Sequence, residues 1–571
     1  MTDSNRNLSP TLLLLSSGSK LTLIFLWIGT LASLFNQPVL HKLSIPFLIA
    51  LGWVFFRNRA GLFNRLSIVT ISVSAFFAWT WIGPLWSIPS NDDTVNHLGL
   101  LQSMLQSGHV LIGKIAKPGA EFLGHAPYHF YPSGTHAFIA FFEPLQGSLP
   151  ALMKAVVLAA LTVFPLSMIA GVQHYLKQAP ELKNWAIFIA VAAATQAVFP
   201  LSALGEGGMS RIVATVIFIP LWFQWITETP SRRQTLFFGA IAAPMLLFLH
   251  PSLLPFLGFI LITVPKKRWI WALASLAMGV GTFAAMLKSA PQEVLKPELL
   301  QQLTAGLPTG FLGWFDRLKS PFHYWFSDPD GYLKFFSPKN WLIYLGVWMC
   351  WCGQAPRRYL LLFLTPFAIA ATALISSSLL QQLGLIFYHS TKRASELTPL
   401  LGVTIAAAAI RYSLSSETGL TRLMKTKWVN RIALPLLVLS FLAVFFSKSQ
   451  TRLQGYHSLY HSLTLPRSRE LKEAFLAQVP AGIEILRIEH PRLEFLRYEN
   501  LDHYRVFTLR PECQEVGTPS PYCIRRAQWP WPGVKNVLWV RSREQLGAED
   551  KFSFTEFNSF DVKAWQRSDL E

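Results

Sequence analysis

Two adjacent carboxylates, Asp92 and Asp93, stand directly after the long apolar run 66–88. Charged side chains are costly to hold near lipid, so an acidic pair at the end of a membrane-crossing segment usually lies in a wet cavity and has a chemical role. A carboxylate in such a cavity could accept a proton from an attacking hydroxyl or bind a divalent cation. The alternative is that the pair only caps the helix that follows.

The residues after the acidic pair predict a helix over 94–107. Its apolar residues repeat at helical spacing and would let it lie along a membrane surface: Leu98, Leu101, Met104 and Leu105. A helix that begins near Thr94 has Asp93 as its cap and His97 one turn further on the same side. We therefore predict Asp92, Asp93 and His97 as catalytic residues, with Asp93 and His97 also able to bind Mg²⁺ or Mn²⁺.

The composition indicates that the acidic pair belongs to a membrane protein. Of 571 residues, 51% are hydrophobic and only 14% are charged, with a mean hydropathy of +0.35, whereas soluble proteins carry about 25% charged residues. The net charge of +19 could suggest nucleic-acid binding. The basic residues are instead spread through short loops between apolar runs, which is the pattern of the positive-inside rule, so we exclude nucleic acid as a partner.

Thirteen apolar runs predict a multi-span bundle of helices, because a backbone that faces lipid must satisfy its own hydrogen bonds. They cover residues 21–35, 43–56, 66–88, 151–172, 184–200, 211–226, 235–249, 252–264, 269–287, 341–353, 359–379, 397–410 and 432–447. The first run lacks a convincing cleavage site and is interpreted as a retained signal anchor.

The loops between these runs predict the orientation of the chain. One alternating set is short and basic, and by the positive-inside rule it is cytoplasmic; it covers residues 57–65, 177–183, 232–233, 266–268, 357–358 and 411–431. The other set is longer and is predicted to be extracytoplasmic; it covers residues 89–135, 201–210, 288–340 and 380–396. The amino terminus is then cytoplasmic and the carboxyl terminus lies outside, in a multi-pass protein of the plasma (inner) membrane.

The predicted architecture is an all-α polytopic membrane domain over 1–447, with large outer loops at 89–135 and 288–340, and a small extracytoplasmic soluble α/β domain over 448–571. Short strands are expected in that second domain at 483–488, 537–540 and 552–557. Cys513 and Cys523 also lie there, and in an oxidising compartment they could form a disulfide.

The outer loops hold further candidates for a substrate cavity. Tyr128, His129, Tyr131 and His136 could stack on a sugar or clamp a lipid head group, or they could be an interfacial aromatic belt. His250 stands in a tight hairpin between two runs and is added to this set.

Three basic residues and one acid complete the candidates. Glu206 and Arg211 flank a glycine-rich loop whose backbone could approach a ligand, although a plain turn with a solvated acid explains it equally. Lys392 and Arg393 form a basic pair in an outer loop, against the charge rule. Arg211, Lys392 and Arg393 are therefore predicted to bind a phosphate, with random surface charge as the alternative for the pair.

In these features the chain resembles the GT-C membrane glycosyltransferases, which include oligosaccharyltransferase catalytic subunits, protein mannosyltransferases and bacterial lipid A aminoarabinose transferases. The resemblance covers the many-span layout, Asp92-Asp93 at the start of the first large outer loop, the amphipathic helix after it and the outer carboxyl-terminal domain. It implies a polyprenyl-phosphate-linked sugar donor and a glycan, lipid or protein acceptor that meet in an outer cavity, with one acid of the pair as base or metal ligand. The outer domain has no Trp-Trp-Asp motif, which disfavours an asparagine-glycosylating enzyme.

Two other functions compete with this interpretation. A transporter or flippase would carry charges within its spans, together with broken helices. A polysaccharide polymerase or ligase of another membrane fold would also use lipid-linked sugars, but it would not need an acidic pair at the first large outer loop. A purely structural membrane protein leaves the clustered outer acids, bases and histidines without a purpose.

Overall fold

The fold is given by a computed structural model, which describes the amino-terminal half of the chain most completely. The described residues are 9–82, 87–88, 92–111, 133–145, 148–176, 209–227, 231–250, 253, 257, 269–288, 400, 404–405, 407–408, 463–464, 473, 477, 485–489, 505–507, 536–541, 554–557 and 560–566.

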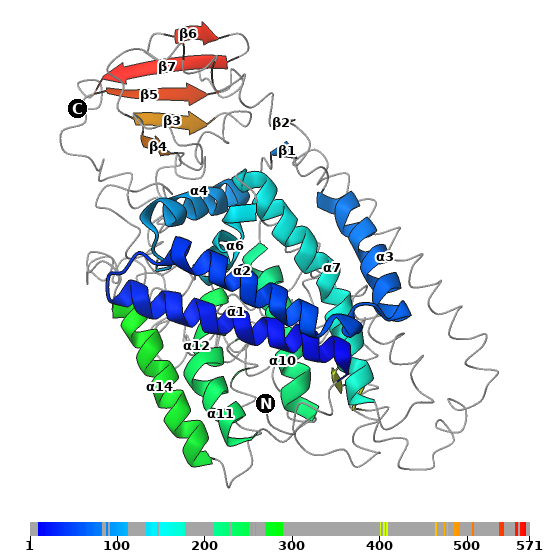
Figure 1. The fold of residues 1–571 in the computed structure, drawn as a ribbon. Coiled ribbons are helices and arrows are strands. Elements are labelled where there is room, and N and C mark those ends of the chain that lie inside the picture. The colour runs from blue at the N-terminus through cyan, green and yellow to red at the C-terminus, as the bar shows by residue number, and fades with distance from the viewer. Residues whose placement is uncertain are drawn as a thin grey trace, which may run out of the picture.

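Helices dominate the first 288 residues (Figure 1). They are α1 (Pro10–Leu34), α2 (Leu40–Arg57), η2 (Arg59–Gly61), α3 (Arg65–Ile82), α4 (Asp92–Ser107), α6 (Gly134–Ala140), η4 (Glu143–Leu145), α7 (Leu149–Tyr175), α10 (Met209–Thr227), α11 (Arg232–Phe237), η6 (Phe238–Ala242), α12 (Ala243–Leu249) and α14 (Trp269–Lys288). Among the described residues, α1, α2, α7 and α10 are long and apolar enough to cross a bilayer. The chain is therefore a helical membrane protein, and the total of thirteen spans stays a prediction.

Three predicted spans have different bounds in the structure. The first begins at Pro10 rather than residue 21, because Ser9 caps the helix by accepting a hydrogen bond from Leu12 N–H and Pro10 occupies the first turn. The third ends at Ile82 rather than residue 88, just before a Gly-Pro pair that disfavours helix. The span 235–249 contains a π-helical turn, η6, between α11 and α12.

The other spans fall into two groups. The spans 43–56, 151–172, 211–226 and 269–287 are confirmed as helices by α2, α7, α10 and α14. The spans 184–200, 252–264, 341–353, 359–379, 397–410 and 432–447 lie wholly or mostly outside the described residues. Within 397–410, Thr404 accepts a hydrogen bond from Trp222 Nε1 of α10 at 2.9 Å, so this distant segment packs against α10.

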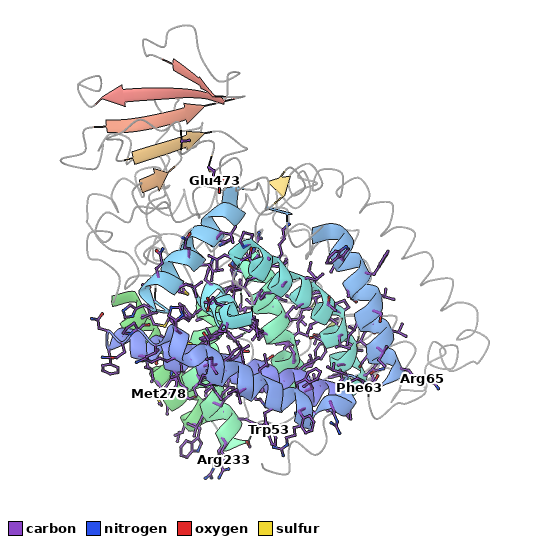
Figure 2. The ribbon with its side chains drawn as sticks, turned by 45° about the horizontal axis from the view of Figure 1, so that its top comes forward. Trp53, Phe63, Arg65, Arg233, Met278 and Glu473 are labelled. Atoms are coloured by element: carbon purple, nitrogen blue, oxygen red, sulfur yellow. The ribbon has the colours of Figure 1, made fainter. Side chains whose placement is uncertain are left out.

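Exposed apolar side chains cover the outer faces of several helices. On α2 they repeat every three or four residues, at Ile45, Ile49, Trp53 and Phe56. In Figure 2, Trp53, Phe63 and Met278 project away from the bundle. A soluble monomer rarely exposes such large apolar stripes, so these faces are suited to contact with lipid.

One end of the bundle is organised around the amphipathic helix α4, and we call it the α4 end. Leu40 N–H at the start of α2 donates to Gly108 O just after α4, at 3.0 Å. Val110 N–H donates to Ser33 Oγ near the end of α1 at 2.9 Å, and Val110 O accepts from Ser133 Oγ, also at 2.9 Å. Figure 1 shows α4 lying across the ends of α6 and α7.

The opposite end carries exposed arginines, and we call it the arginine end. The start of α1 lies here, since Thr11 Oγ1 donates to Gly61 O at 2.7 Å and Leu12 packs against Ala170 near the end of α7. The exposed arginines are Arg57, Arg59, Arg65, Arg232 and Arg233. The guanidinium of Arg232 lies 5.7 Å from the ring centre of Trp271. Arginines beside aromatic rings are typical of a cytoplasmic membrane interface.

Two short strands tie the acidic segment to the carboxyl-terminal region. β1 (Ser87–Ile88), just before α4, pairs antiparallel with β2 (Leu463–Thr464). The ten spans predicted between these strands would return the chain to the same side of the membrane, in agreement with this pairing.

A second sheet lies near the carboxyl terminus, beyond α4 in Figure 1. Its strand order is β4-β3-β5-β7-β6, with β4, β3 and β5 parallel and the other pairs antiparallel. The strands are β3 (Ile485–Glu489), β4 (Arg505–Phe507), β5 (Asn536–Arg541), β6 (Phe554–Phe557) and β7 (Phe560–Gln566). The three predicted strands are confirmed by β3, β5 and β6, and an extracytoplasmic α/β domain stays a prediction.

We expect Gly171→Ala to destabilise the protein, because a Cβ at Gly171 would overlap the ring of Phe223 where α7 meets α10. Overpacking of this kind costs about 1–3 kcal/mol. Gly52→Ala on α2 is the matched control, since a Cβ there meets nothing within 4 Å. Thermal unfolding in detergent, followed by size-exclusion chromatography, should show a lower midpoint for Gly171→Ala alone; equal midpoints would contradict the close approach of α7 and α10.

The membrane orientation can be tested with single cysteines at two residues that Figure 2 places at opposite ends, Arg233 and Glu473. In intact cells, we expect a membrane-impermeant maleimide to label Glu473→Cys above the background of the parent chain. Arg233→Cys should be labelled only after permeabilisation, because arginine-rich loops are retained in the cytoplasm. The reverse result would invert the predicted topology.

Candidate functional site

The acidic pair lies at the amino-terminal end of α4. This helix begins at Asp92, two residues earlier than predicted, so the prediction that Asp93 caps a helix starting near Thr94 is wrong. Both acids belong to the first turn, where the positive end of the helix dipole favours negative charge. Asp93 and His97 remain four residues apart, the spacing that places two residues on one helix face.

His97 contacts a second histidine from another helix. Its Nδ1 lies 2.9 Å from Nε2 of His136 on α6, and their ring centres are 5.0 Å apart. One of these nitrogens must carry the proton and the other must accept it. Both side chains are buried, with 8% exposure for His97 and none for His136. A metal could therefore reach the His97 ring only through Nε2.

His136 is held in its neutral form. Burial lowers the pKa of His136 well below its ordinary value of 6.5, and the nearby His97 lowers it further. A neutral imidazole has one donor and one acceptor nitrogen. His136 can therefore fix the orientation of the His97 ring and exchange a proton with it without carrying a charge itself.

The helix α6 brings two further segments, the start of α10 and the end of α12, to this histidine pair. Thr135 Oγ1 lies 3.4 Å from Ser210 O at the start of α10 and 3.4 Å from Leu249 O at the end of α12. A Cβ on Gly134 would lie 2.8 Å from Phe248 O, so the backbones of α6 and α12 are nearly in contact and only glycine fits there.

Two other predicted residues follow directly from these contacts. Arg211 comes after Ser210 and is 5% exposed, and His250 comes after Leu249 and is 4% exposed. His97, His136, Arg211 and His250 are thus four of the predicted site residues that the fold gathers, buried, at the α4 end. The sequence predicts Arg211 as a phosphate-binding residue and His250 as a cavity residue, at two separate outer turns. The contacts of Thr135 with Ser210 and Leu249 bring these two turns together.

The sequence analysis missed one buried cation, Lys154. It is 3% exposed and lies near the start of α7, the end that α4 and β1 contact. The sequence could have identified it, because Lys154 is the only Lys or Arg in the apolar segment 149–175. Among the Asp, Glu, His, Lys and Arg side chains whose burial the structure describes, the buried ones are all basic. We call them the buried basic cluster: His97, His136, Lys154, Arg211 and His250.

Several predicted site residues lie outside what the structure describes. They are Tyr128, His129, Tyr131, Glu206, Lys392 and Arg393, together with the predicted disulfide partners Cys513 and Cys523. Within the described ranges, no group of three or more His, Cys, Asp or Glu side chains could hold a metal ion. Asp93 and His97 would supply two ligands at most, and Mg²⁺ prefers oxygen to imidazole.

Because His136 resists protonation when folded, the protein should lose stability as the pH falls. Below about pH 6.5 the unfolded chain takes up a proton that the folded chain refuses, at a cost of up to about 1.4 kcal/mol per pH unit. Thermal midpoints measured from pH 7.5 to 5 should fall less steeply for His136→Gln than for wild type. Parallel curves for His136→Gln and wild type would argue against a neutral buried His136.

Comparison with known proteins places this chain in a family. The family described as "Family of unknown function (DUF6541)" matches residues 58–478, which include α4, α6, α7, α10 and the whole buried basic cluster. No curated protein matches the sequence at a significant level. Since the match spans well over half of its length, the chain belongs to the DUF6541 family.

Proposed function

We propose that this protein is an integral-membrane glycosyltransferase, which moves a sugar from a polyprenyl-phosphate donor to an acceptor at the extracytoplasmic face. The observation that carries the proposal is the buried basic cluster, which lies at the same end of the bundle as the helix that begins with Asp92 and Asp93. Anionic phosphate needs buried positive charge, and an attacking hydroxyl needs a nearby carboxylate. The resemblance to GT-C enzymes in layout supports the same function.

The reaction would be a displacement at the anomeric carbon. The acceptor oxygen forms a bond to that carbon while the bond between the carbon and the phosphate oxygen of the lipid breaks. A carboxylate of the acidic pair takes the proton of the acceptor hydroxyl. The electron pair of the broken bond leaves with the lipid phosphate, whose growing negative charge is stabilised by cations such as Arg211. The predicted Lys392 and Arg393 would add to this stabilisation.

The histidine pair has a positioning role in this scheme. His97 lies one helical turn from Asp93, and its ring is held by His136 at 2.9 Å. An imidazole held in one tautomer can orient a carboxylate or pass on the proton that it accepts. The described residues include no group of three candidate ligands, and a divalent metal ion bound with ligands from elsewhere in the chain stays a prediction.

The membrane-facing surface also supports a lipid-linked donor. The apolar side chains on α2 and α14 are exposed and suited to contact with lipid. A polyprenyl chain could therefore approach the bundle from the bilayer while its phosphate reaches the α4 end. The acceptor class, whether glycan, lipid or protein, is left open by this chemistry.

The first test is sugar transfer in membranes from cells that express each variant at equal levels. A mixed pool of polyprenyl-phosphate donors with radiolabelled sugars should label an acceptor in wild type. Loss of a general base typically costs 10²–10⁴-fold in rate, so Asp92→Asn or Asp93→Asn should abolish most of the transfer. Glu143→Gln, an acid just after α6, is the matched control and should transfer normally. Full activity in both aspartate variants would show that the acidic pair only stabilises the first turn of α4.

A flippase for anionic lipids is the second candidate, because buried basic residues inside a bundle would also suit a path for a phosphate head group. Vesicles that contain the purified protein and a fluorescent polyprenyl phosphate separate the two functions. A flippase moves the lipid between leaflets without a sugar or an acceptor. A transferase releases free lipid phosphate only when the probe carries a sugar on its phosphate and an acceptor is present.

A further inference from the structure

We propose that the outer face of α2 and the turn after it bind an anionic phospholipid, with an acyl chain along the helix and the phosphate beside Arg59. This surface leads to the arginine end, opposite the candidate site, and the proposal does not depend on the proposed function. In Figure 2, Trp53 projects away from the bundle and Arg65 lies at the arginine end. We call the segment 57–65 the arginine turn, and the exposed side chains of α2 the α2 stripe: Ile45, Ile49, Trp53 and Phe56.

The α2 stripe has the length of one lipid leaflet. Its side chains are 58–68% exposed, and they belong to a helix that is long and apolar enough to cross a bilayer. From Ile45 to Phe56 the helix rises about 16 Å, and half of the hydrocarbon core of a bilayer is about 15 Å thick. An acyl chain that lies along the stripe therefore brings its head group to the end of α2, where the arginine turn begins.

The α2 stripe ends in a cation that contacts its last aromatic ring. The guanidinium of Arg59 lies over the ring of Phe56, 4.6 Å from its centre. The ring of Phe56 is in turn stacked on that of Trp53, with their centres 6.4 Å apart. A guanidinium over a ring still presents N–H groups at its edge, so the exposed Arg59 can donate to a phosphate while it contacts Phe56. Direct contact thus joins the apolar stripe to a phosphate donor.

Hydrogen bonds hold the arginine turn in one arrangement. Gly61 O accepts three side-chain hydrogen bonds at 2.7, 2.8 and 2.9 Å, from Thr11 Oγ1, Asn64 Nδ2 and Ser67 Oγ. The backbone of Arg59 is held as well, since its carbonyl accepts from Leu62 N–H at 2.9 Å. A turn that is already ordered loses little entropy when a ligand binds, which favours a defined head-group site.

The charge of the arginine turn indicates an anionic lipid. The turn carries Arg57, Arg59 and Arg65, and the sequence has no aspartate or glutamate between Asp3 and Asp92. Arg65 is in the first turn of α3, where a cation opposes the helix dipole, so it is not there to stabilise that helix. Basic residues beside a membrane span attract anionic head groups. A second copy of this chain on the same face would instead bring two arginine turns together, which like charges disfavour.

The first test counts phosphatidylglycerol molecules bound to the full-length protein in detergent, by native mass spectrometry over a lipid titration. The site variant is Arg59→Gln/Arg65→Gln. The matched control is Arg232→Gln/Arg233→Gln, which removes the same charge from exposed arginines at the same end. Each arginine near an anionic lipid surface contributes roughly fivefold to binding, so the site variant should bind roughly twentyfold more weakly and the control as wild type. Wild-type binding by the site variant, or equal losses in both variants, would overturn the proposal.

Two comparison ligands test the head group and the tail. Phosphatidylcholine has the same chains and a phosphate but no net charge, so the site variant should lose much less affinity for it. An equally large loss would assign the arginines to packing and contradict the proposal. Glycerol 3-phosphate lacks the chains and should not displace phosphatidylglycerol from wild type. Displacement at matching concentrations would make this surface a site for free phosphate and would reject the lipid.

A measurement on wild type covers the case in which the site variant does not fold. Phosphatidylglycerol with a photoreactive group on one acyl chain is incorporated with the protein into phosphatidylcholine nanodiscs, irradiated and mapped by mass spectrometry. Adducts within 45–56 that excess unlabelled phosphatidylglycerol suppresses support the proposal, and adducts confined to other segments overturn it. None of these measurements contains a sugar donor or an acceptor, so their outcome is separate from that of the transfer assay.

Discussion

The candidate site depends on the placement of one short helix, α6, between the ends of longer ones. Among the described residues, its first residues connect α4, α10 and α12. Thr135 lies between the backbones of Ser210 and Leu249, and His136 holds His97. Since α6 has only seven residues, it has little helical stability of its own, and tertiary contacts must hold it. Its other end is anchored in a cluster of phenylalanines.

That phenylalanine cluster explains how a seven-residue helix is kept in place. Phe47 of α2 lies at the centre, with ring-centre distances of 4.9 Å to Phe141 and 5.4 Å to Phe25 of α1. Phe138 and Phe142 complete it at 6.2 and 5.5 Å from Phe47. Edge-to-face aromatic pairs of this kind add to the energy of apolar burial. The polar start of α6 can therefore form the site while its aromatic end is packed against α1 and α2.

The same end of the bundle concentrates charge that most membrane proteins avoid. Burying the charged side chains of lysine and arginine among apolar helices opposes folding, because a cation loses its hydration. A bundle needs only apolar packing and small residues at close contacts to be stable, as Gly171 against Phe223 illustrates. The buried basic cluster is thus an added cost to stability. A cost of this kind, at the end where two acids begin α4, is typical of a functional site.

The sequence by itself determined the membrane class, the approximate spans and the importance of the acidic segment. Apolar runs are long, local signals, and so α2, α7, α10 and α14 could be predicted. The start of α1 and the true end of α3 depended on cap and proline signals that hydropathy alone misses. A local pattern also could not show that Thr135 lies between Ser210 and Leu249, which are 75 and 114 residues away. Only the tertiary structure decided which residues share the site, because burial and the pairing of His97 with His136 arise from helix packing and not from spacing along the chain.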